Sequence, residues 1–449
     1  MSFTIDKQTL EDLNIFGKSG QKSIFNIYNK TKTFGGSLVL KEIFSYPLSD
    51  FSKIQDRIKI IEFFEQTSLS FPFEVDSFNV VEEYLEDGDS RTQLDPNEKF
   101  FKRLYKKVIG AHSAFETIKL GVVTTMSLLK SASDLFLSDD LAPIEPYYHD
   151  LKQIRTLFSE EKMKRLGECS FGKNPNYSEV VELDRILRFE VQNKILRLLK
   201  YIYYLDVYFT VAQIATARGF NFAQVIDSSD NIMDIDQMYH PYVPNAVANS
   251  LSLDKNGNII FLTGANMAGK STYMKTFGIV VYLAHLGLPV PAKSMRFTPK
   301  SGLYTTINLP DNISMGYSHF YADVLRVKKV AEHICRESNL VVIFDELFRG
   351  TNVKDAYDAT VAVTDAFAAN KKCTVMISTH IIEAGEELQK LKDNIKYIYL
   401  PTNIVDGRPT YSYKSIEGIT SDRHGMVIIR NEGIIEGLNE GAKRLKNKN

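Results

Sequence analysis

Hydrophobic residues follow two different periods along the chain, and the change comes near residue 235. Before it, apolar residues recur every three or four positions in 40–44, 54–64, 100–114 and 178–217, the spacing of one helical face. After it, the runs NIIFLTG, LVVIFDE and CTVMISTH are short and β-branched and alternate with helical patterns, as in a buried parallel sheet. The pattern predicts a multidomain chain, with a mostly α-helical domain over 1–235 and an α/β domain over 236–449.

Composition restricts the classes of protein that this pattern can belong to. With 449 residues, of which 44% are hydrophobic and 24% charged, the chain can bury sizeable cores. A formal net charge of -1 gives no overall attraction to nucleic acid, so DNA contact would need local basic clusters. The three cysteines form no C-x-x-C pair, which favours a reducing, cytoplasmic location. The hydropathy pattern predicts neither a signal peptide nor a membrane span.

The stretch GANMAGKST at 264–272 has the form G-x-x-x-x-G-K-S and joins a strand-like run to a helix-like run. Gly264 and Gly269 allow successive backbone N–H groups to converge on phosphate oxygens at a helix N-terminus. Lys270 adds a positive charge for the β and γ phosphates, and Ser271 offers a hydroxyl to Mg²⁺. The spacing predicts a nucleotide site with Mg²⁺, and a tight structural turn is the alternative.

Two further motifs lie at predicted strand ends. LVVIFDELFRGT ends its apolar run in Asp345 and Glu346, where one carboxylate can hold Mg²⁺ and its neighbour can activate water. The run ending in STH places His380 at the same edge of the sheet, where strand ends form ligand crevices. His380 is either a γ-phosphate contact or a structural histidine.

The wording and order of these motifs resemble one family. TGANMAGKST, DELFRGT and STH are similar to TGPNMGGKST, DELGRGT and ATH in the ATPase domain of the MutS family of DNA mismatch-repair proteins. MYHPYVPN, MGYSHFYADVLRV and YSYKSIEGITSDRHGMVIIRNEGI resemble other segments of that domain, and the stretch from TLEDLN to IIEFF resembles the start of the family's core domain. The resemblance covers most of the chain and is weakest between 90 and 175.

The resemblance implies a helical core and lever domain followed by an ABC-type, MutS-like P-loop ATPase domain that binds ATP and Mg²⁺ as a homodimer. It implies that Ser318 enters the partner's nucleotide site and that Tyr413 lies against adenine; a surface serine and a packing aromatic are the alternatives. The expected catalytic residues are Glu346, Lys270 and His380, and the expected metal ligands are Ser271 and Asp345. The expected nucleotide-binding residues are Gly264, Ala265, Asn266, Met267, Ala268, Gly269, Lys270, Ser271, Thr272, Ser318 and Tyr413.

The sequence departs from the family pattern at several of these positions. Ala265 and Ala268 stand where the family has Pro and Gly, and His319 and Asp323 stand where it has Thr and Glu. We expect these substitutions to retune the site without abolishing it. Ala246 replaces an aromatic residue, which removes one base-stacking contact and leaves nucleobase selectivity open.

The sequence opens in the core-like segment. The resemblance therefore implies a truncated form without the N-terminal mismatch-recognition and connector domains, and with a reduced or absent clamp. The tripeptides at 63–65 and 158–160 fit the family's Phe-x-Glu wedge, but we attribute both matches to chance. Direct reading of mismatches by insertion is not expected.

Basic clusters at 99–107 and 162–166 are the candidates for DNA contact. A basic face opposite an apolar one can meet phosphates, and the solvated face of a core helix is the alternative. The expected partners are DNA, as a mismatched or branched duplex, and MutL-like repair proteins. The sequence does not indicate which DNA structure, pathway or partner applies.

Together these features favour an ATP-dependent DNA-binding ATPase of repair or recombination. One alternative is a scaffold that binds ATP only to dimerise. The other is an ABC-type ATPase subunit of another complex, although the L-S-G-G-Q motif of those proteins is not found in the sequence.

Overall fold

The computed structural model describes residues 3–17, 21–67, 69–94, 113–168, 175–307, 319–336, 339–405, 408–420 and 433–446. The chain forms two compact units, and each is described by itself. Unit 1 comprises Met1–Asn26, Tyr46–Ile58 and Ala217–Asn449, and unit 2 comprises Ile27–Ser45 and Lys59–Thr216.

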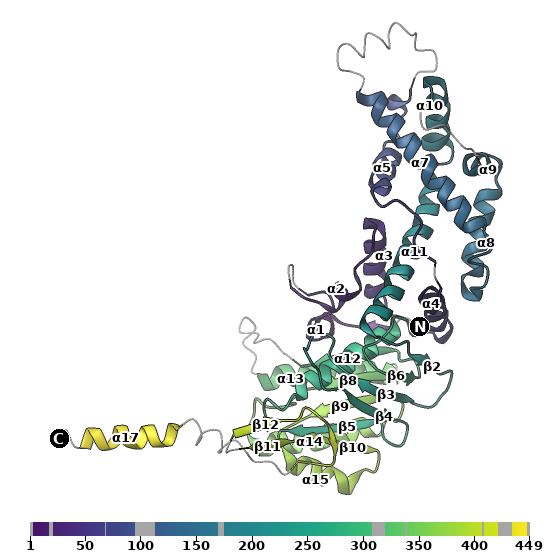
Figure 1. Ribbon diagram of the computed structural model, residues 1–449. Helices are drawn as coiled ribbons and strands as arrows, with labels where there is room; N and C mark the ends of the chain where they lie inside the picture. Colours follow the sequence, from purple (N-terminus) through teal and green to yellow (C-terminus); the bar gives the residue numbers. More distant parts are fainter. Residues whose placement is uncertain are drawn as a thin grey trace. The chain divides into compact units, whose positions relative to one another are not determined.

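A seven-stranded sheet is the centre of unit 1 (Figure 1). The strands lie in the order β1-β7-β8-β9-β5-β10-β13, and every neighbouring pair is parallel except β10 and β13. Their bounds are β1 (Thr4–Ile5), β5 (Ile259–Gly264), β7 (Gly302–Thr306), β8 (Leu340–Phe344), β9 (Thr374–Ser378), β10 (Ile395–Leu400) and β13 (Ile416–Glu417). The three apolar runs predicted as strands are confirmed as β5, β8 and β9, which are buried along their whole length.

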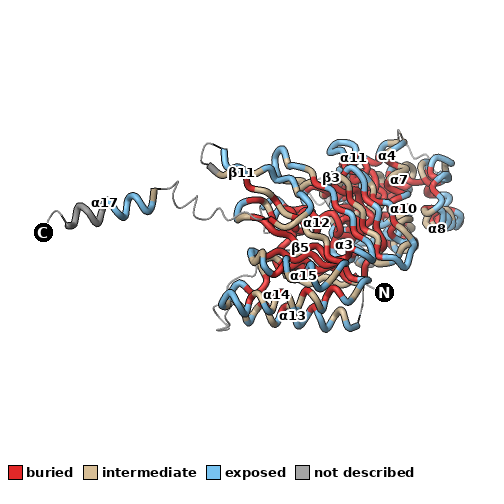
Figure 2. Tube along the Cα trace, turned by 90° about the horizontal axis from the view of Figure 1, so that it is seen from below, coloured by how far each residue is buried: buried red, intermediate tan, exposed pale blue. Residues whose placement is uncertain are grey.

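Helices cover both faces of this sheet. Alternate strand residues such as Phe261 and Val342 share one core with α13, α14 and α15. On the other face, Gly278 of α12 lies against Ile343. The bounds are α12 (Lys270–His285), α13 (His319–Arg336), α14 (Val353–Ala368) and α15 (Ile382–Leu391). Figure 2 shows α12 and the neighbouring strands buried, while α13 and α14 keep exposed outer faces.

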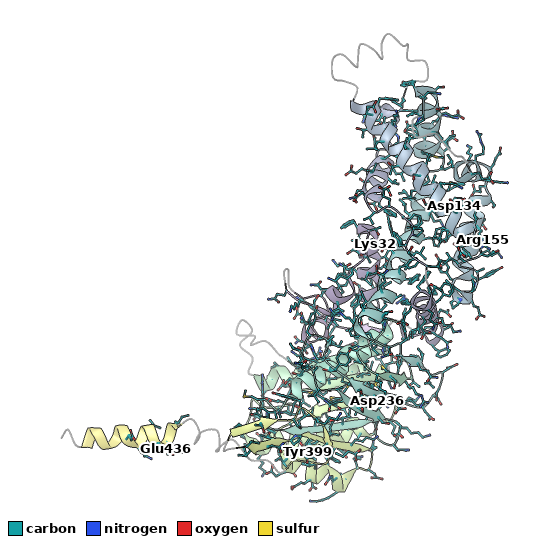
Figure 3. All side chains as sticks on the ribbon, viewed as in Figure 1. Lys32, Asp134, Arg155, Asp236, Tyr399 and Glu436 are labelled. Atoms are coloured by element: carbon teal, nitrogen blue, oxygen red, sulfur yellow. The ribbon has the colours of Figure 1, made fainter. Side chains whose placement is uncertain are left out.

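Smaller elements complete unit 1. A four-stranded sheet has the order β2-β6-β3-β4, and β11 pairs with β12. Asp236, labelled in Figure 3, lies on β3. The bounds are β2 (Gln224–Val225), β3 (Met233–Met238), β4 (Asn249–Leu253), β6 (Ser294–Phe297), β11 (Thr402–Val405), β12 (Arg408–Tyr411), α1 (Lys7–Asp12), α2 (Ile24–Tyr28, which ends in unit 2) and α17 (Ile434–Lys446).

The secondary-structure elements described in unit 2 are all helical. Its α-helices are α3 (Phe34–Ser45), α4 (Phe51–Gln66, which begins in unit 1), α5 (Asp76–Glu86), α7 (Ser113–Leu137), α8 (Tyr148–Ser159), α9 (Glu161–Glu168), α10 (Tyr177–Asp184) and α11 (Gln192–Arg218, which ends in unit 1). The short elements are two 3-10 turns, η1 (Ser90–Thr92) and η2 (Glu145–Tyr147), and a π-helical turn, η3 (Arg185–Glu190).

The long helix predicted over 178–217 is interrupted in the structure. The π-helical turn η3 separates α10 from α11 because Arg188 and Asp184 turn inward and pair with each other inside unit 2. The apolar spacing does not register this break, because Leu183, Leu187 and Val191 stay buried through the turn.

One helical stretch, Phe115–Leu137, has the length and apolar composition to cross a membrane. Half of it is buried inside the protein, and the core helix of a soluble protein meets the same criterion. Arg155 of α8, labelled in Figure 3, donates to the carbonyls of Phe136 at 3.1 Å and Ser138 at 2.7 Å. These bonds satisfy carbonyls at the C-terminal end of α7.

The compact units differ from the predicted division at residue 235. Segments 3–26, 46–58 and 217–235 belong with the sheet, and β1 and β2 lie in the part that was read as helical. These strands have two residues each, so they carry no hydrophobic period. The domain boundary itself stays a prediction.

Candidate functional site

The loop between β5 and α12 depends on glycine at both ends. Gly264 has φ 143°, and Gly269, the residue before α12, has φ 100°. A Cβ at Gly264 would lie 2.9 Å from the Leu400 carbonyl oxygen, and one at Gly269 would lie 3.1 Å from the Tyr413 ring. Met267 between them also has a positive φ of 71°. The backbone therefore curls as the G-x-x-x-x-G-K-S spacing predicts.

Lys270 is the first residue of α12, and its side chain reaches back to this loop. Its side chain is buried, and its Nζ donates to the carbonyls of Gly264 at 2.8 Å and Ala265 at 3.2 Å. Burial lowers the pKa of the Lys270 ammonium, and the carboxylates of Glu346 and Asp345 oppose this shift. The Lys270 ammonium group thus lies near the carboxylates of Glu346 and Asp345.

Asp345 follows β8 and receives two hydroxyl hydrogen bonds. Ser271 at the start of α12 donates to Oδ2 at 2.7 Å, and Ser378 at the end of β9 donates to Oδ1 at 2.5 Å. Burial raises the pKa of the Asp345 carboxyl, and the two hydroxyls oppose that shift. The structure therefore brings the predicted metal pair Ser271 and Asp345 together. The sequence analysis did not predict Ser378, although its hydroxyl begins the STH motif at the end of the third apolar run.

Glu346 is held from both sides. His380 Nε2 lies 2.6 Å from Glu346 Oε1, and Arg349 Nη1 lies 3.5 Å from Oε2. The hydrogen bond with His380 lowers the pKa of the Glu346 carboxyl to about 2, although burial acts in the opposite direction. The carboxylate is ionised at neutral pH and so can accept a proton. Arg349 was missed, although it lies inside the quoted DELFRGT motif.

A cavity of about 600 Å³ opens over the loop, within the size range of small-molecule sites. Residues 265–273, Glu346 and Tyr413 line it, and 238–240, 243–247 and 249 form another wall. Asn249 donates to the Tyr413 carbonyl at 3.0 Å and accepts from the Ser415 N–H at 2.8 Å. These bonds fix Tyr413 at the cavity. Ala246 also lines it, so the departure from the family lies within this wall.

The protein donors suit a magnesium ion that also binds substrate phosphates and water. Among the described residues, no group of three or more His, Cys, Asp or Glu side chains could hold a metal ion. Mg²⁺ is usually bound through one or two protein oxygens together with substrate phosphates and water. Ser271 and Asp345 fit that mode.

Most predicted site residues come together in unit 1. Ala265, Asn266, Met267, Ala268, Gly269, Lys270, Ser271, Thr272, Glu346 and Tyr413 line the cavity. Gly264, Asp345 and His380 are joined to them by hydrogen bonds. Ser318 and the basic cluster at 99–107 lie outside the described residues. The cluster at 162–166 lies on α9, where Met163 and Leu166 are buried.

Comparison with protein families matches residues 8–212 to MutS domain III and residues 260–448 to MutS domain V. The second match contains the loop, Asp345, Glu346 and His380. The first covers most of the helices of unit 2.

Three bacterial proteins named DNA mismatch repair protein MutS are similar to the chain. The one from Thermosipho melanesiensis is 24% identical over 98% of this chain and 64% of its own length. That from Fervidobacterium nodosum is 22% identical over 99% of this chain and 64% of its own length. That from Staphylococcus saprophyticus is 28% identical over 56% of this chain and 30% of its own length. The chain thus spans just under two thirds of the first two relatives.

Proposed function

The chain belongs to the MutS family, and from this premise we propose that it is an ATPase whose nucleotide state controls its grip on DNA. One observation carries the proposal. The Ser271 hydroxyl donates to Asp345 at 2.7 Å beside a cavity of about 600 Å³ lined by the glycine loop. This arrangement supports a P-loop ATPase site with a hydroxyl and a carboxylate at the place of the nucleotide's metal ion.

In this proposal the loop binds the triphosphate of ATP. The backbone N–H groups of residues 265–272 surround the phosphates at the N-terminus of α12. Lys270 exchanges its bonds with the Gly264 and Ala265 carbonyls for bonds to the β and γ phosphates. Tyr413 packs against the adenine. Mg²⁺, held by Ser271 and Asp345, would neutralise phosphate charge.

Glu346 is the proposed general base for hydrolysis. Its carboxylate takes a proton from a water molecule while the water oxygen bonds to the γ phosphorus and the bond to the β–γ bridging oxygen breaks. His380 orients Glu346 through the 2.6 Å contact and contacts the γ phosphate. The low pKa of Glu346, about 2, keeps its carboxylate ionised at neutral pH, so the carboxylate is ready to orient the water and to accept its proton.

The wider assembly is also a proposal. Residue Ser318 of one chain completes the nucleotide site of a second copy, and ATP binding closes this homodimer. Closure shifts the helical unit, which carries the match to MutS domain III, and so controls binding to a mismatched or branched DNA duplex. MutL-like proteins are proposed as later partners, and a cytoplasmic location is proposed on the same basis.

The main alternative is a scaffold that binds ATP to dimerise without hydrolysing it. Glu346 favours the ATPase over the scaffold, because a scaffold does not need an ionised carboxylate held beside the phosphate loop. An ABC-type subunit of another complex is the second alternative, and the matches to two MutS domains speak against it.

The test is ATP hydrolysis by the purified chain across homoduplex, mismatch, loop and junction DNA. We expect DNA-dependent turnover. Glu346→Gln should keep nucleotide binding and slow turnover by about 10² to 10⁴, as is usual for a lost general base. Glu386→Gln, the same change at an exposed position of α15, is the matched control. ATP binding without turnover would favour the scaffold, and unchanged turnover in Glu346→Gln would remove that residue from its role.

A further inference from the structure

The turn after β8 has an unusual backbone. Glu346 has φ 51° and Phe348 has φ 65°, so two residues that are not glycine adopt the left-handed conformation within three positions. This conformation is disfavoured for residues with a side chain, and it persists only where neighbouring groups hold it. The contacts of this turn therefore decide where the Glu346 carboxylate lies.

Three hydrogen bonds from different elements hold the turn. The Asp345 N–H donates to the Thr306 carbonyl at 2.9 Å, and the Glu346 N–H donates to the Ser378 carbonyl at 3.0 Å. These two acceptors are backbone groups of β7 and β9. The third bond joins the Phe348 N–H to the carboxylate Oδ2 of Asp323 on α13, at 3.2 Å. It is the member of the three that a side-chain substitution can remove.

Asp323 is well placed to act as a fixed anchor. Its side chain is buried, with 7% of the residue exposed. Three residues earlier on α13, the ring of Phe320 packs against Phe348 with centroids 5.9 Å apart. Helix α13 therefore contacts both the backbone and the side chain of Phe348.

Helix α13 is itself tied to the sheet. Arg326 is buried and donates to the Thr305 carbonyl at 2.7 Å and to the Thr306 hydroxyl at 3.2 Å. The Tyr304 hydroxyl and His333 Nδ1 lie 2.9 Å apart further along the helix. These contacts fix α13 against the end of β7. Because α13 is fixed to the sheet, its residue Asp323 has a fixed position and can hold the turn after β8 in place.

We propose that Asp323 is a positioning residue that aims Glu346 at its reaction partner through the Phe348 N–H. Asp323 is buried and its carboxylate accepts from the Phe348 N–H, so it acts through the turn without touching the nucleotide. The inference rests on the proposed function, because it assumes that Glu346 positions the attacking water.

The first experiment compares Asp323→Ala with Asp323→Asn in ATP hydrolysis by the full chain. Alanine removes the acceptor, and we expect kcat to fall by about 10- to 100-fold, the scale of a small misplacement of a catalytic group. The KM for ATP should stay within about threefold, because the nucleotide contacts are intact. Asparagine keeps an acceptor oxygen and should restore most of kcat. Asp358→Ala on the exposed side of α14 is the control.

The second experiment places Asp323→Ala in the Glu346→Gln background. If Asp323 acts through Glu346, the double variant should be no more than about threefold slower than Glu346→Gln alone, because effects within one unit do not add. Full additivity of the two losses would overturn the inference. So would an unchanged kcat in Asp323→Ala, or an asparagine variant as slow as the alanine variant.

The outcomes separate this inference from the proposed function. If Glu346→Gln slows hydrolysis but Asp323→Ala does not, the positioning role fails and the ATPase proposal stands. If the wild-type chain binds ATP without hydrolysing it, the ATPase proposal fails first. Thermal unfolding of each variant identifies a misfolded Asp323→Ala, in which case Asp323→Leu, which keeps the side-chain volume but has no acceptor oxygen, replaces it in both experiments.

Discussion

Two clusters of buried polar side chains, one in each unit, use similar groups in opposite ways. In unit 2, Arg188 donates to both Asp184 oxygens at 2.6 and 2.7 Å. It also donates to the Asp87 carbonyl at 2.8 Å and to the Thr92 hydroxyl at 2.9 Å. Tyr84 donates to Asp184 at 2.8 Å. The guanidinium is fully used inside the protein.

The cluster in unit 1 faces a cavity. Ser271 donates to Asp345 and His380 contacts Glu346, and the loop beside them lines a space of about 600 Å³. Lys270 is bonded to carbonyls of its own loop, and a ligand phosphate can replace these. This cluster keeps hydrogen-bonding capacity for a ligand.

The difference teaches how to separate structural from functional polar clusters. Burial, charge and short hydrogen bonds are present in both, so none of them identifies a site. What separates them is their surroundings: protein groups enclose Arg188, whereas the residues of the glycine loop line a cavity. Substitutions should therefore change the free energy of unfolding in unit 2 and ligand affinity in unit 1.

The largest effect is expected for Arg188→Ala. Removing one partner of a buried pair leaves Asp184 uncompensated, and we expect a loss of about 3 to 5 kcal/mol in the free energy of unfolding. Denaturant unfolding measures it. Arg185→Ala in the same π-helical turn is the control, because Arg185 is largely exposed and pairs with Glu190 at the surface, and it should cost less than about 1 kcal/mol. Equal losses in both variants would contradict a closed cluster at Arg188.

His285 tests whether burial away from the cavity, and not location in unit 2, makes a polar group matter for the free energy of unfolding. It is fully buried in unit 1, away from the cavity lining, and burial lowers its pKa to about 4. The unfolded chain takes up a proton near pH 6.5, so stability is lost as pH falls from about 6.5 to about 4, by about 3 kcal/mol at most.

The measurement is the free energy of unfolding against pH for the wild type and for His285→Gln, which does not titrate. The wild-type curve should fall more steeply toward acid by about the stated amount. Parallel curves would mean that the imidazole titrates alike in the folded and unfolded chain.

Lys270→Ala should affect ligand affinity before stability. Losing charge-assisted hydrogen bonds to phosphate should weaken nucleotide binding by about 10- to 100-fold. Calorimetric titration with ATP and Mg²⁺ measures this change. Lys255→Ala, which removes an exposed lysine of unit 1, should bind as the wild type does. An unchanged ATP affinity in Lys270→Ala would show that this lysine stabilises the loop but does not bind the nucleotide.

Ser378→Ala should have the smallest effect. It removes one of two hydroxyl donors to Asp345 while leaving Ser271 in place, so ATP turnover should fall by only about 2- to 10-fold, the scale of one hydrogen bond. Raising the Mg²⁺ concentration should recover part of the loss if Ser378 orients a metal carboxylate. A loss as large as that of Glu346→Gln would assign Ser378 a larger role than the structure supports.

The sequence predicted the parts of the site that are contiguous in the chain. The loop at 264–272 can be recognised because its glycine, lysine and serine residues stand at a fixed spacing. Asp345 and His380 can be recognised because they follow apolar runs, which form β8 and β9. Linear spacing could not show that Asp323, on a helix, would hold the turn of Glu346. The family resemblance placed Ala246 near the nucleobase, but linear spacing could not show the rest of the wall formed by 238–240, 243–247 and 249, because these residues reach the loop only in the folded chain.

The hydrophobic pattern did not register elements that depend on tertiary contacts. Two-residue strands such as β1 exist only because β7 supplies their hydrogen bonds. At the break at η3, Arg188 and Asp184 pair with each other and also bond to groups about a hundred positions earlier in the chain. Neither feature can be predicted from the pattern of neighbouring residues in the sequence.

The central claim is that the cavity over the glycine loop is a site for ATP. A crystal structure of the full chain with Mg²⁺ and a non-hydrolysable ATP analogue tests it most directly. The account predicts the triphosphate within hydrogen-bonding distance of the backbone N–H groups between Ala265 and Thr272, with the metal ion on the Ser271 hydroxyl. An analogue bound elsewhere, or a loop that stays empty at saturating concentration, would contradict it.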